Sequence, residues 1–243
     1  MAFRSSTTEG ELDEHKLRRK YRWRVAIFAF CAILTCIVFG TVYDAIQALS
    51  RLEGVERERD QWQRPADVMQ ELNLADGSVV ADLGSGVGYF ALKLSVKVGP
   101  SGRVLAVDIL KYPLCVLRTR VFIVHQHNVS TILGDSDDPH LPVGSVDAVL
   151  IANTYHELTA SKAVLAQLHR SFKHGGRLVI LDHAARLGSG ASRESEAGHH
   201  EITRAVVEDE LLSAGFEILK RDDRFVDRSD EDNIWWLITA RKP

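Results

Sequence analysis

The chain has 243 residues, of which 45% are hydrophobic, and a formal net charge of −3 at pH 7. This length suits one or two domains, and the apolar content is ordinary for a globular chain. The slight excess of acidic residues does not suit binding to nucleic-acid phosphates, so no nucleic-acid partner is expected. Charge alone does not exclude an RNA substrate. The three cysteines have neither a CxxC arrangement nor a metal-ligand spacing, which argues against a disulfide and against thiol chemistry.

The N-terminal region is predicted to have three parts. Residues 1–24 form a basic tail, and residues 25–44 form a transmembrane helix, because VAIFAFCAILTCIVFGTVY carries no charge. At about 1.5 Å per residue this helix reaches about 28 Å, close to the hydrocarbon thickness of a bilayer. A secretory signal peptide is the main alternative, but the apolar part is longer than a usual signal core and no small-residue cleavage site follows. Residues 45–64 are a charged helical linker interrupted by Gly54.

Strand-like and helical patterns alternate from residue 65 onward. Pro65 suits a first helical turn. Helical stretches separate five apolar runs, and two closely linked strand-like runs, FEILKRDDRFV and IWWLITARKP, lie near the end of the chain. Such alternation predicts an α/β fold with a parallel sheet that helices cover on both faces. The least regular stretch is 111–126, where Pro113 and several β-branched residues blur the expected helix. The five predicted strands are Val79–Leu83, Val104–Ile109, Val129–Leu133, Val146–Ala152 and Leu178–Leu181.

A glycine-rich turn follows the first of these strands, in the sequence VVADLGSGVGYF. Gly84, Gly86 and Gly88 lie between the strand and a helix predicted over Tyr89–Lys97. Glycine lacks a Cβ atom, so such a turn lets a ligand approach the backbone and exposes N–H groups at the start of the helix. The turn therefore indicates a nucleotide-like cofactor. The dinucleotide fingerprint requires Gly or Ala where this chain has Tyr89, which disfavours a nicotinamide cofactor.

With this turn the chain resembles the class I S-adenosylmethionine-dependent methyltransferases, and the resemblance continues in RVLAVDIL, NVSTILGDSDD, SVDAVLIANTYHEL and FKHGGRLVILDH. It covers roughly Trp62 to the C-terminus. It implies a methyltransferase domain over 65–243, built on a Rossmann-like, seven-stranded, mostly parallel sheet that an antiparallel strand pair closes. S-adenosylmethionine is the implied cofactor.

The resemblance also assigns the cofactor site. Asp108 would hold the ribose hydroxyls, Asp82 would face the methionine amino group, and Asp135 with Ser136 would meet the adenine edge. The alternatives are that Asp108 caps the next helix, that Asp82 stabilises the turn, and that GDSDDPH is only a solvated loop. The remaining residues of the predicted cofactor site are Gly84, Gly86, Gly88 and Asn153.

Substrates of open α/β sheets lie beyond the carboxyl ends of the strands, where Tyr155, His156 and Glu157 follow the fourth strand. These three are the candidate catalytic residues. His156 is the predicted base, because imidazole titrates near neutrality. It could instead simply cap a helix that starts near Thr159. A metal is a further alternative, but the spacing matches no recognised ligand pattern, so no metal site is predicted. The side chains considered for it are His156, Glu157, Asp182, His183, His199 and His200, the last two taken to open the next helical stretch.

The expected function is methyl transfer to an unidentified small or membrane-associated acceptor, such as a lipid or quinone. A non-catalytic, membrane-tethered cofactor-binding module and a nicotinamide-dependent oxidoreductase are the alternatives. Seven Lys and Arg precede the span and four follow it in the linker, which favours a cytoplasmic N-terminus and a domain outside. S-adenosylmethionine is made inside cells, which favours a single-pass membrane protein with a cytoplasmic domain. The oligomeric state is not predicted.

Overall fold

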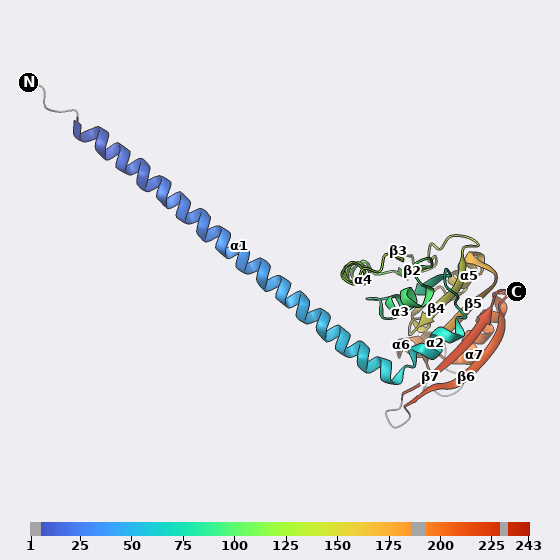
Figure 1. The fold of residues 1–243 in the computed structure, drawn as a ribbon. Coiled ribbons are helices and arrows are strands. Elements are labelled where there is room, and N and C mark those ends of the chain that lie inside the picture. The colour runs from blue at the N-terminus through green and yellow to red at the C-terminus, as the bar shows by residue number, and fades with distance from the viewer. Residues whose placement is uncertain (1–5, 186–192, 229–232) are drawn as a thin grey trace, which may run out of the picture. The chain divides into compact units, whose positions relative to one another are not determined.

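The computed structural model describes residues 6–185, 193–228 and 233–243. The chain separates into two units, Met1–Arg59 and Asp60–Pro243. Helix α1, Ser6–Trp62, accounts for the described part of the first unit (Figure 1). Within it, Arg18–Trp62 is the one helix in the described residues that is long and apolar enough to cross a membrane by length and composition.

The helix α1 runs without a break from Ser6, in the predicted tail, through the predicted span to Trp62, in the predicted linker. The interruption expected at Gly54 is wrong, because α1 continues through that residue. A glycine inside a helix costs only about 1 kcal/mol, which the surrounding helix formers offset. The division into parts at residues 24, 44 and 64 remains a prediction, since a single helix can contain all three.

The second unit is built on one seven-stranded sheet with the order β3-β2-β1-β4-β5-β7-β6. The pairs β1–β2, β2–β3, β1–β4 and β4–β5 are parallel, whereas β7 is antiparallel to both β5 and β6. The predicted Rossmann-like sheet, closed by an antiparallel strand pair, is therefore confirmed. The strands are β1 Val79–Leu83, β2 Arg103–Asp108, β3 Val129–Leu133, β4 Val146–Ala152, β5 Phe172–His183, β6 Glu217–Arg228 and β7 Asn233–Arg241.

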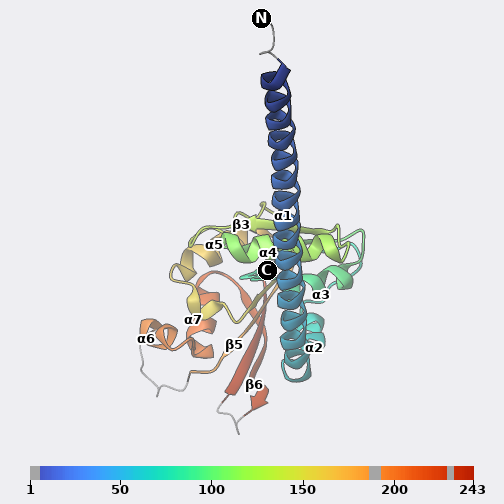
Figure 2. The same cartoon turned by 90° about the vertical axis from the view of Figure 1, so that its left-hand side faces the viewer.

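Helices cover both faces of this sheet, as the alternation predicts (Figure 2). On one face the apolar core includes Val164 from α5 and Leu211 from α7. On the other it includes Val68 from α2, Leu94 from α3 and Leu117 from α4. The helices are α2 Pro65–Glu71, α3 Tyr89–Val98, α4 Lys111–Ile123, α5 Ser161–Ser171, α6 Arg193–Gly198 and α7 Arg204–Ser213, with a short 3₁₀ helix η1 at Tyr155–Glu157.

The parallel strands bring several loops to one edge of the sheet. The carboxyl ends of β1, β2, β3, β4 and β5 all lie there, because these strands run in the same direction. The glycine turn follows β1, Asp108 ends β2, and η1 follows β4. In open α/β sheets ligands bind at this edge, so it is where the functional site is sought.

Candidate active site

The three glycines of the turn after β1 differ in what surrounds them. All have positive φ, of 77° at Gly84, 52° at Gly86 and 98° at Gly88, which other residues adopt only with strain. A Cβ atom at Gly84 would overlap the Thr154 side chain, and one at Gly88 would overlap Leu117 of α4. A Cβ atom at Gly86 would meet nothing within 4 Å. Gly84 and Gly88 are thus required for packing, while Gly86 borders open space that a ligand can enter.

Asp108 joins the end of β2 to the glycine turn. Its Oδ2 accepts a hydrogen bond from the Gly86 N–H at 2.9 Å, and its Oδ1 accepts one from the Leu110 N–H, also at 2.9 Å. The second bond closes a turn just before α4, whose N-cap residue Leu110 has no side-chain cap, so Asp108 does not cap this helix. Each carboxylate oxygen retains further acceptor capacity, which two ribose hydroxyls can use.

The turn also contains a buried polar group that suits a ligand. Asp82 in β1 is 3% exposed, and Ser85 is 7% exposed. Among the described residues, no atom forms a hydrogen bond with the Ser85 hydroxyl. Buried hydroxyls are seldom left without a partner, so this one favours a polar ligand at the turn. The open space at Gly86, the acceptors of Asp108 and this donor together fit a nucleoside cofactor.

The glycine turn is also held by Arg120 of α4, a residue that the sequence pattern does not single out. Arg120 of α4 is 8% exposed, and its guanidinium donates to the Val87 carbonyl oxygen at 2.8 Å. A buried cationic donor on a backbone carbonyl fixes the turn more firmly than a neutral bond. The only signal in the sequence is an arginine among the apolar residues of an irregular helix.

The other predicted cofactor residues lie at the same edge of the sheet. The loop that carries Asp135 and Ser136 is tied to β2, because the Gly134 N–H donates to the Asp108 carbonyl oxygen at 3.0 Å. Asp135 is largely exposed and lies 3.1 Å from His140 Nε2, and Ser136 is exposed. Asn153 has a left-handed φ of 57° just after β4. Their roles at a cofactor remain predictions.

His156 is held by a buried carboxylate. Asp182, at the end of β5, is fully buried and places Oδ1 2.8 Å from His156 Nδ1. Its Oδ2 accepts the His156 backbone N–H at 3.1 Å. Burial is the largest single influence on the imidazole and disfavours its charged form, but the hydrogen bond and charge of Asp182, helped by Glu157, outweigh it. The pKa of His156 is therefore raised above its usual value of 6.5.

Tyr155 belongs to the hydrophobic core. It is fully buried, and its hydroxyl donates to Glu210 Oε2 of α7 at 2.6 Å. Burial, followed by the hydrogen bond and the charge of Glu210, raises the pKa of Tyr155 far above its usual value. Arg193 completes the group, with its Nε 2.9 Å from Glu210 Oε1. The geometry gives Tyr155 a structural position and offers no support for its predicted catalytic role.

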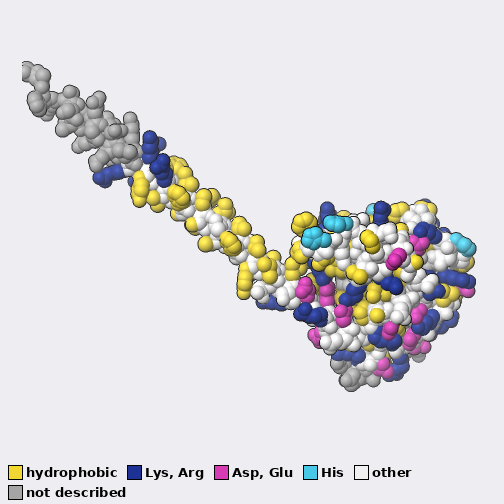
Figure 3. Space-filling model, in the orientation of Figure 1, with side chains coloured by type: hydrophobic (Ala, Val, Ile, Leu, Met, Phe, Trp, Pro, Cys, Tyr) yellow, Lys and Arg dark blue, Asp and Glu magenta, His cyan; other side chains and the backbone are white. Residues whose placement is uncertain are grey.

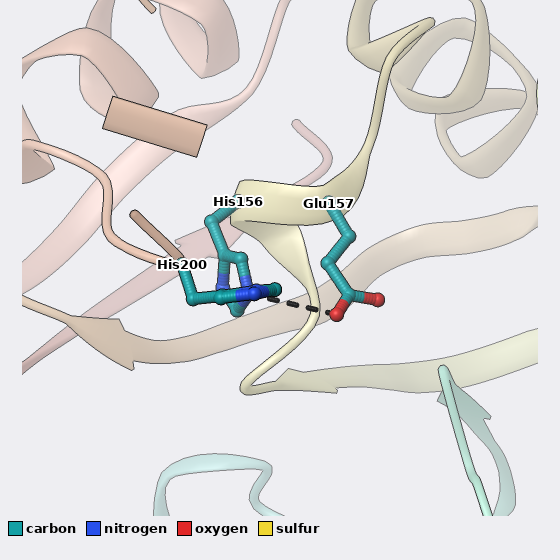
Figure 4. A group of neighbouring side chains, drawn as sticks. All are labelled: His156, Glu157 and His200. Carbon is teal, nitrogen blue, oxygen red and sulfur yellow. Dashed lines mark ion pairs between the residues drawn. The ribbon is translucent and has the colours of Figure 1, made fainter. Parts of the chain in front are cut away.

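A cavity of about 860 Å³ opens beside η1. Its lining includes His156, Glu157, Arg193, His200 and Glu210. The side chains of His156, Glu157 and His200 point toward one another (Figure 4), and each contributes one donor atom to a group lying within 4.8 Å. His156 Nε2 is 3.7 Å from Glu157 Oε1, and the two imidazole rings are perpendicular at 5.6 Å.

These three side chains could face a cation, but one neighbour disfavours it. The guanidinium of Arg193 lines the same cavity and repels a cation.

Two expectations from the sequence change here. His199 and His200 lie in a turn ahead of α7, which begins at Arg204, so they do not open a helix. The segment between them and α7 is held by the Ile202 N–H, which donates to the His183 carbonyl oxygen, and by the Ile202 carbonyl oxygen, which accepts from the Trp236 indole. His183 stacks on Trp235, with ring centroids 3.7 Å apart, and so does not join His156.

Comparison with known proteins relates this domain to methyltransferases. Residues 81–180 match the model of a methyltransferase domain family. A demethylmenaquinone methyltransferase of Geobacillus stearothermophilus is 30% identical over 126 residues, which are 52% of this chain and 53% of that protein. The one of Oceanobacillus iheyensis is 23% identical over 145 residues, 60% of each chain. The chain thus spans only about half to three fifths of the length of these relatives.

Solved structures show the same fold. A S-adenosylmethionine-dependent methyltransferase from Aquifex aeolicus superposes with a TM-score of 0.67 at 24% identity, covering 80% of this chain and 98% of that one. Geranyl diphosphate C-methyltransferase from Streptomyces coelicolor has a TM-score of 0.63 at 15% identity, covering 74% and 76%. The [4+2]-cyclase SpnF has a TM-score of 0.64 at 18% identity, covering 74% and 81%.

The second unit thus combines a seven-stranded sheet of this order with a glycine turn after β1 and a carboxylate at the end of β2. Its residues 81–180 match a methyltransferase domain family, and its fold is that of a solved S-adenosylmethionine-dependent methyltransferase.

Proposed function

We propose that the chain is a methyltransferase that uses S-adenosylmethionine and acts on a small, membrane-soluble, quinone-like acceptor. The observation that carries the proposal is the position of the Gly86–Asp108 hydrogen bond and the His156–Asp182 pair at one edge of the sheet. The first offers a place for a nucleoside and the second a base. The fold alone would not be enough, because similar folds include a protein described as a cyclase.

The cofactor would be held by residues of this chain that already fit it. Gly86 leaves space beside the turn, Ser85 offers a buried hydroxyl, and Asp108 offers carboxylate oxygens. When bound, S-adenosylmethionine supplies an electrophilic methyl group. Asp82, Asp135, Ser136 and Asn153 are proposed to complete the site, on the strength of the family resemblance.

His156 would act on the acceptor. Its Nδ1 is engaged by Asp182, so Nε2 is the nitrogen left to receive a proton from an acceptor hydroxyl in the cavity. Asp182 stabilises the imidazolium that results, because a buried carboxylate favours the charged ring. Glu157, 3.7 Å from Nε2, adds a second negative charge at the mouth. General base catalysis of this kind typically contributes about 10²–10⁴-fold in rate.

Two observations motivate a membrane location and a membrane-soluble acceptor: the apolar part of α1 and the names of the relatives. The apolar part of α1 has the length and composition of a span, which would keep the domain near a bilayer. Two relatives are named for demethylmenaquinone, an acceptor in that lipophilic class. We propose a single-pass anchor with the domain in the cytoplasm, where S-adenosylmethionine is made.

The test begins with cofactor binding by the purified full-length chain in detergent. Isothermal titration with S-adenosylhomocysteine should show binding, and NAD should show none; the reverse result would assign the chain to the nicotinamide enzymes. Transfer of an isotope-labelled methyl group is then measured to a demethylated quinol and to a soluble catechol, with the quinol expected to be the better acceptor.

A variant separates catalysis from binding in the same assay. His156→Asn should keep its affinity for S-adenosylhomocysteine and lose about 10²–10⁴-fold in transfer rate. Binding without transfer to any acceptor, in the unmodified chain, would leave only a tethered cofactor-binding module.

A further inference from the structure

Helix α4 presents apolar side chains to solvent on the face turned away from the sheet. Tyr112 is 79% exposed and Phe122 is 80% exposed, and Ile123 and Val124 are about half exposed. The opposite face packs Leu117 into the core. α4 therefore carries large apolar side chains on its exposed face as well as on its buried face, which is typical of an interaction surface.

The segment that carries this face contains basic residues and no acidic ones. Residues 109–134 contain no Asp or Glu. Lys111 and Arg118 of α4 are exposed beside the apolar side chains. The Thr119 hydroxyl donates to the Cys115 carbonyl oxygen within the helix, so the polar group on this face is satisfied internally. Hydrophobic and histidine side chains gather on the visible surface of the domain in this region (Figure 3).

We propose that the outer face of α4, which we call the α4 face and define by Tyr112, Cys115, Phe122, Ile123 and Val124, docks on the surface of an anionic lipid bilayer. Apolar side chains flanked by Lys111 and Arg118, in a segment that contains no Asp or Glu, complement a negatively charged interface. Two copies of the α4 face would instead bring their bases together. The same chain carries a helix able to cross a membrane, so a bilayer is within reach of the domain.

This docking would place the proposed cofactor site beside the bilayer, because α4 begins shortly after Asp108. It rests on the proposed membrane anchor but not on the proposed methyl transfer, since it concerns where the domain lies and not what it methylates.

A native cysteine allows the test without altering the α4 face. Cys115 is exposed on it, and the other two cysteines, Cys31 and Cys36, can be changed to serine. The full-length chain is labelled at Cys115 with an environment-sensitive fluorophore and reconstituted into vesicles of phosphatidylcholine, alone or mixed with phosphatidylglycerol. The matched control carries Cys115→Ser and Leu212→Cys, since Leu212 is also about half exposed but lies on α7.

The label at Cys115 should shift to shorter emission wavelength and be quenched by a lipid-borne nitroxide, more strongly with phosphatidylglycerol, while the label at position 212 should show neither effect. Lys111→Glu with Arg118→Glu should abolish the response to phosphatidylglycerol. Equal quenching at both positions would overturn the proposal. A shift that appears in detergent without phospholipid and grows with protein concentration would also overturn it, in favour of a second copy of the chain.

Discussion

The Nδ1 atom of His156 lies 2.8 Å from the Oδ1 atom of Asp182, and both side chains are almost completely buried. The pair forms because η1 follows β4 and Asp182 is the penultimate residue of the adjacent strand β5. Asp182 also accepts the His156 and His183 backbone N–H groups, so the carboxylate is fixed by both strand ends. The imidazole consequently has one orientation, with Nε2 left for the cavity.

The transfer rate should depend on pH through this pair. A base must be neutral, and Asp182 raises the pKa of His156 above 6.5, so kcat/KM should fall as the pH drops through a midpoint above 6.5. Asp182→Asn should move that midpoint lower and reduce the rate by roughly a hundredfold or more, since the imidazolium loses its counter-charge. The measurement is a pH–rate profile of each variant.

Glu157→Gln is the control for this profile. Glu157 is largely exposed, so its charge is screened and its removal should lower the midpoint only slightly. A profile that is unchanged by Asp182→Asn would rule out His156 as the titrating base.

Cofactor affinity should depend on the open space at Gly86. Gly86→Ala places a methyl group in that space, where S-adenosylhomocysteine is expected, and should weaken binding by about tenfold or more, or at least about 1.4 kcal/mol. Gly144→Ala is the matched control, because its φ of 59° resembles the 52° of Gly86 and its Cβ atom would also meet nothing within 4 Å. Gly144 precedes β4, at the opposite edge of the sheet.

Both alanine variants carry similar backbone strain, so their unfolding temperatures should fall alike. Calorimetric titration of S-adenosylhomocysteine should then separate them. Equal affinities would place the cofactor away from the turn.

Much of the fold follows from the sequence because its signals are local. β1, β3 and β4 have the predicted bounds, because turn residues mark the ends of each of these runs in the sequence. β5 is longer than predicted and begins at Phe172, although glycines within it suggest a break. Pairing with β4, which includes an irregularity between Val146 and Ala148, keeps that segment in the sheet. Such pairing depends on a distant strand and is not visible in the run itself.

The site divides in the same way. Gly86 and Asp108 could be proposed from the sequence because each lies at the end of a recognisable strand. Gly86 is in the turn after β1, and Asp108 is the last residue of β2. Glu210 and Arg193 could not, because they reach Tyr155 only when α6 and α7 fold over η1. The raised pKa of His156 likewise requires Asp182, which is 26 positions further along the chain.

Removing the Tyr155 hydroxyl should affect stability and not catalysis. Tyr155→Phe deletes the hydrogen bond to Glu210, which retains Arg193, and should cost about 0.5–1.5 kcal/mol of unfolding free energy. The transfer rate should stay unchanged. Tyr112→Phe is the control, because that side chain is 79% exposed. Thermal unfolding and the methyl-transfer assay are run on both variants, and a large loss of rate in Tyr155→Phe alone would restore Tyr155 as a catalytic residue.

Two arginines of α4 should differ sharply when each is changed to leucine. Arg120 is buried and donates to the Val87 carbonyl oxygen inside the glycine turn, whereas Arg118 is exposed. Arg120→Leu leaves that carbonyl without its cationic donor and should cost about 1–3 kcal/mol of unfolding free energy. Because the turn then loses a support, affinity for S-adenosylhomocysteine should fall as well. Arg118→Leu should change neither quantity in detergent. If Arg120→Leu lowers stability but leaves affinity intact, Arg120 supports only the packing of α4, and the turn keeps its shape through the Gly86–Asp108 bond.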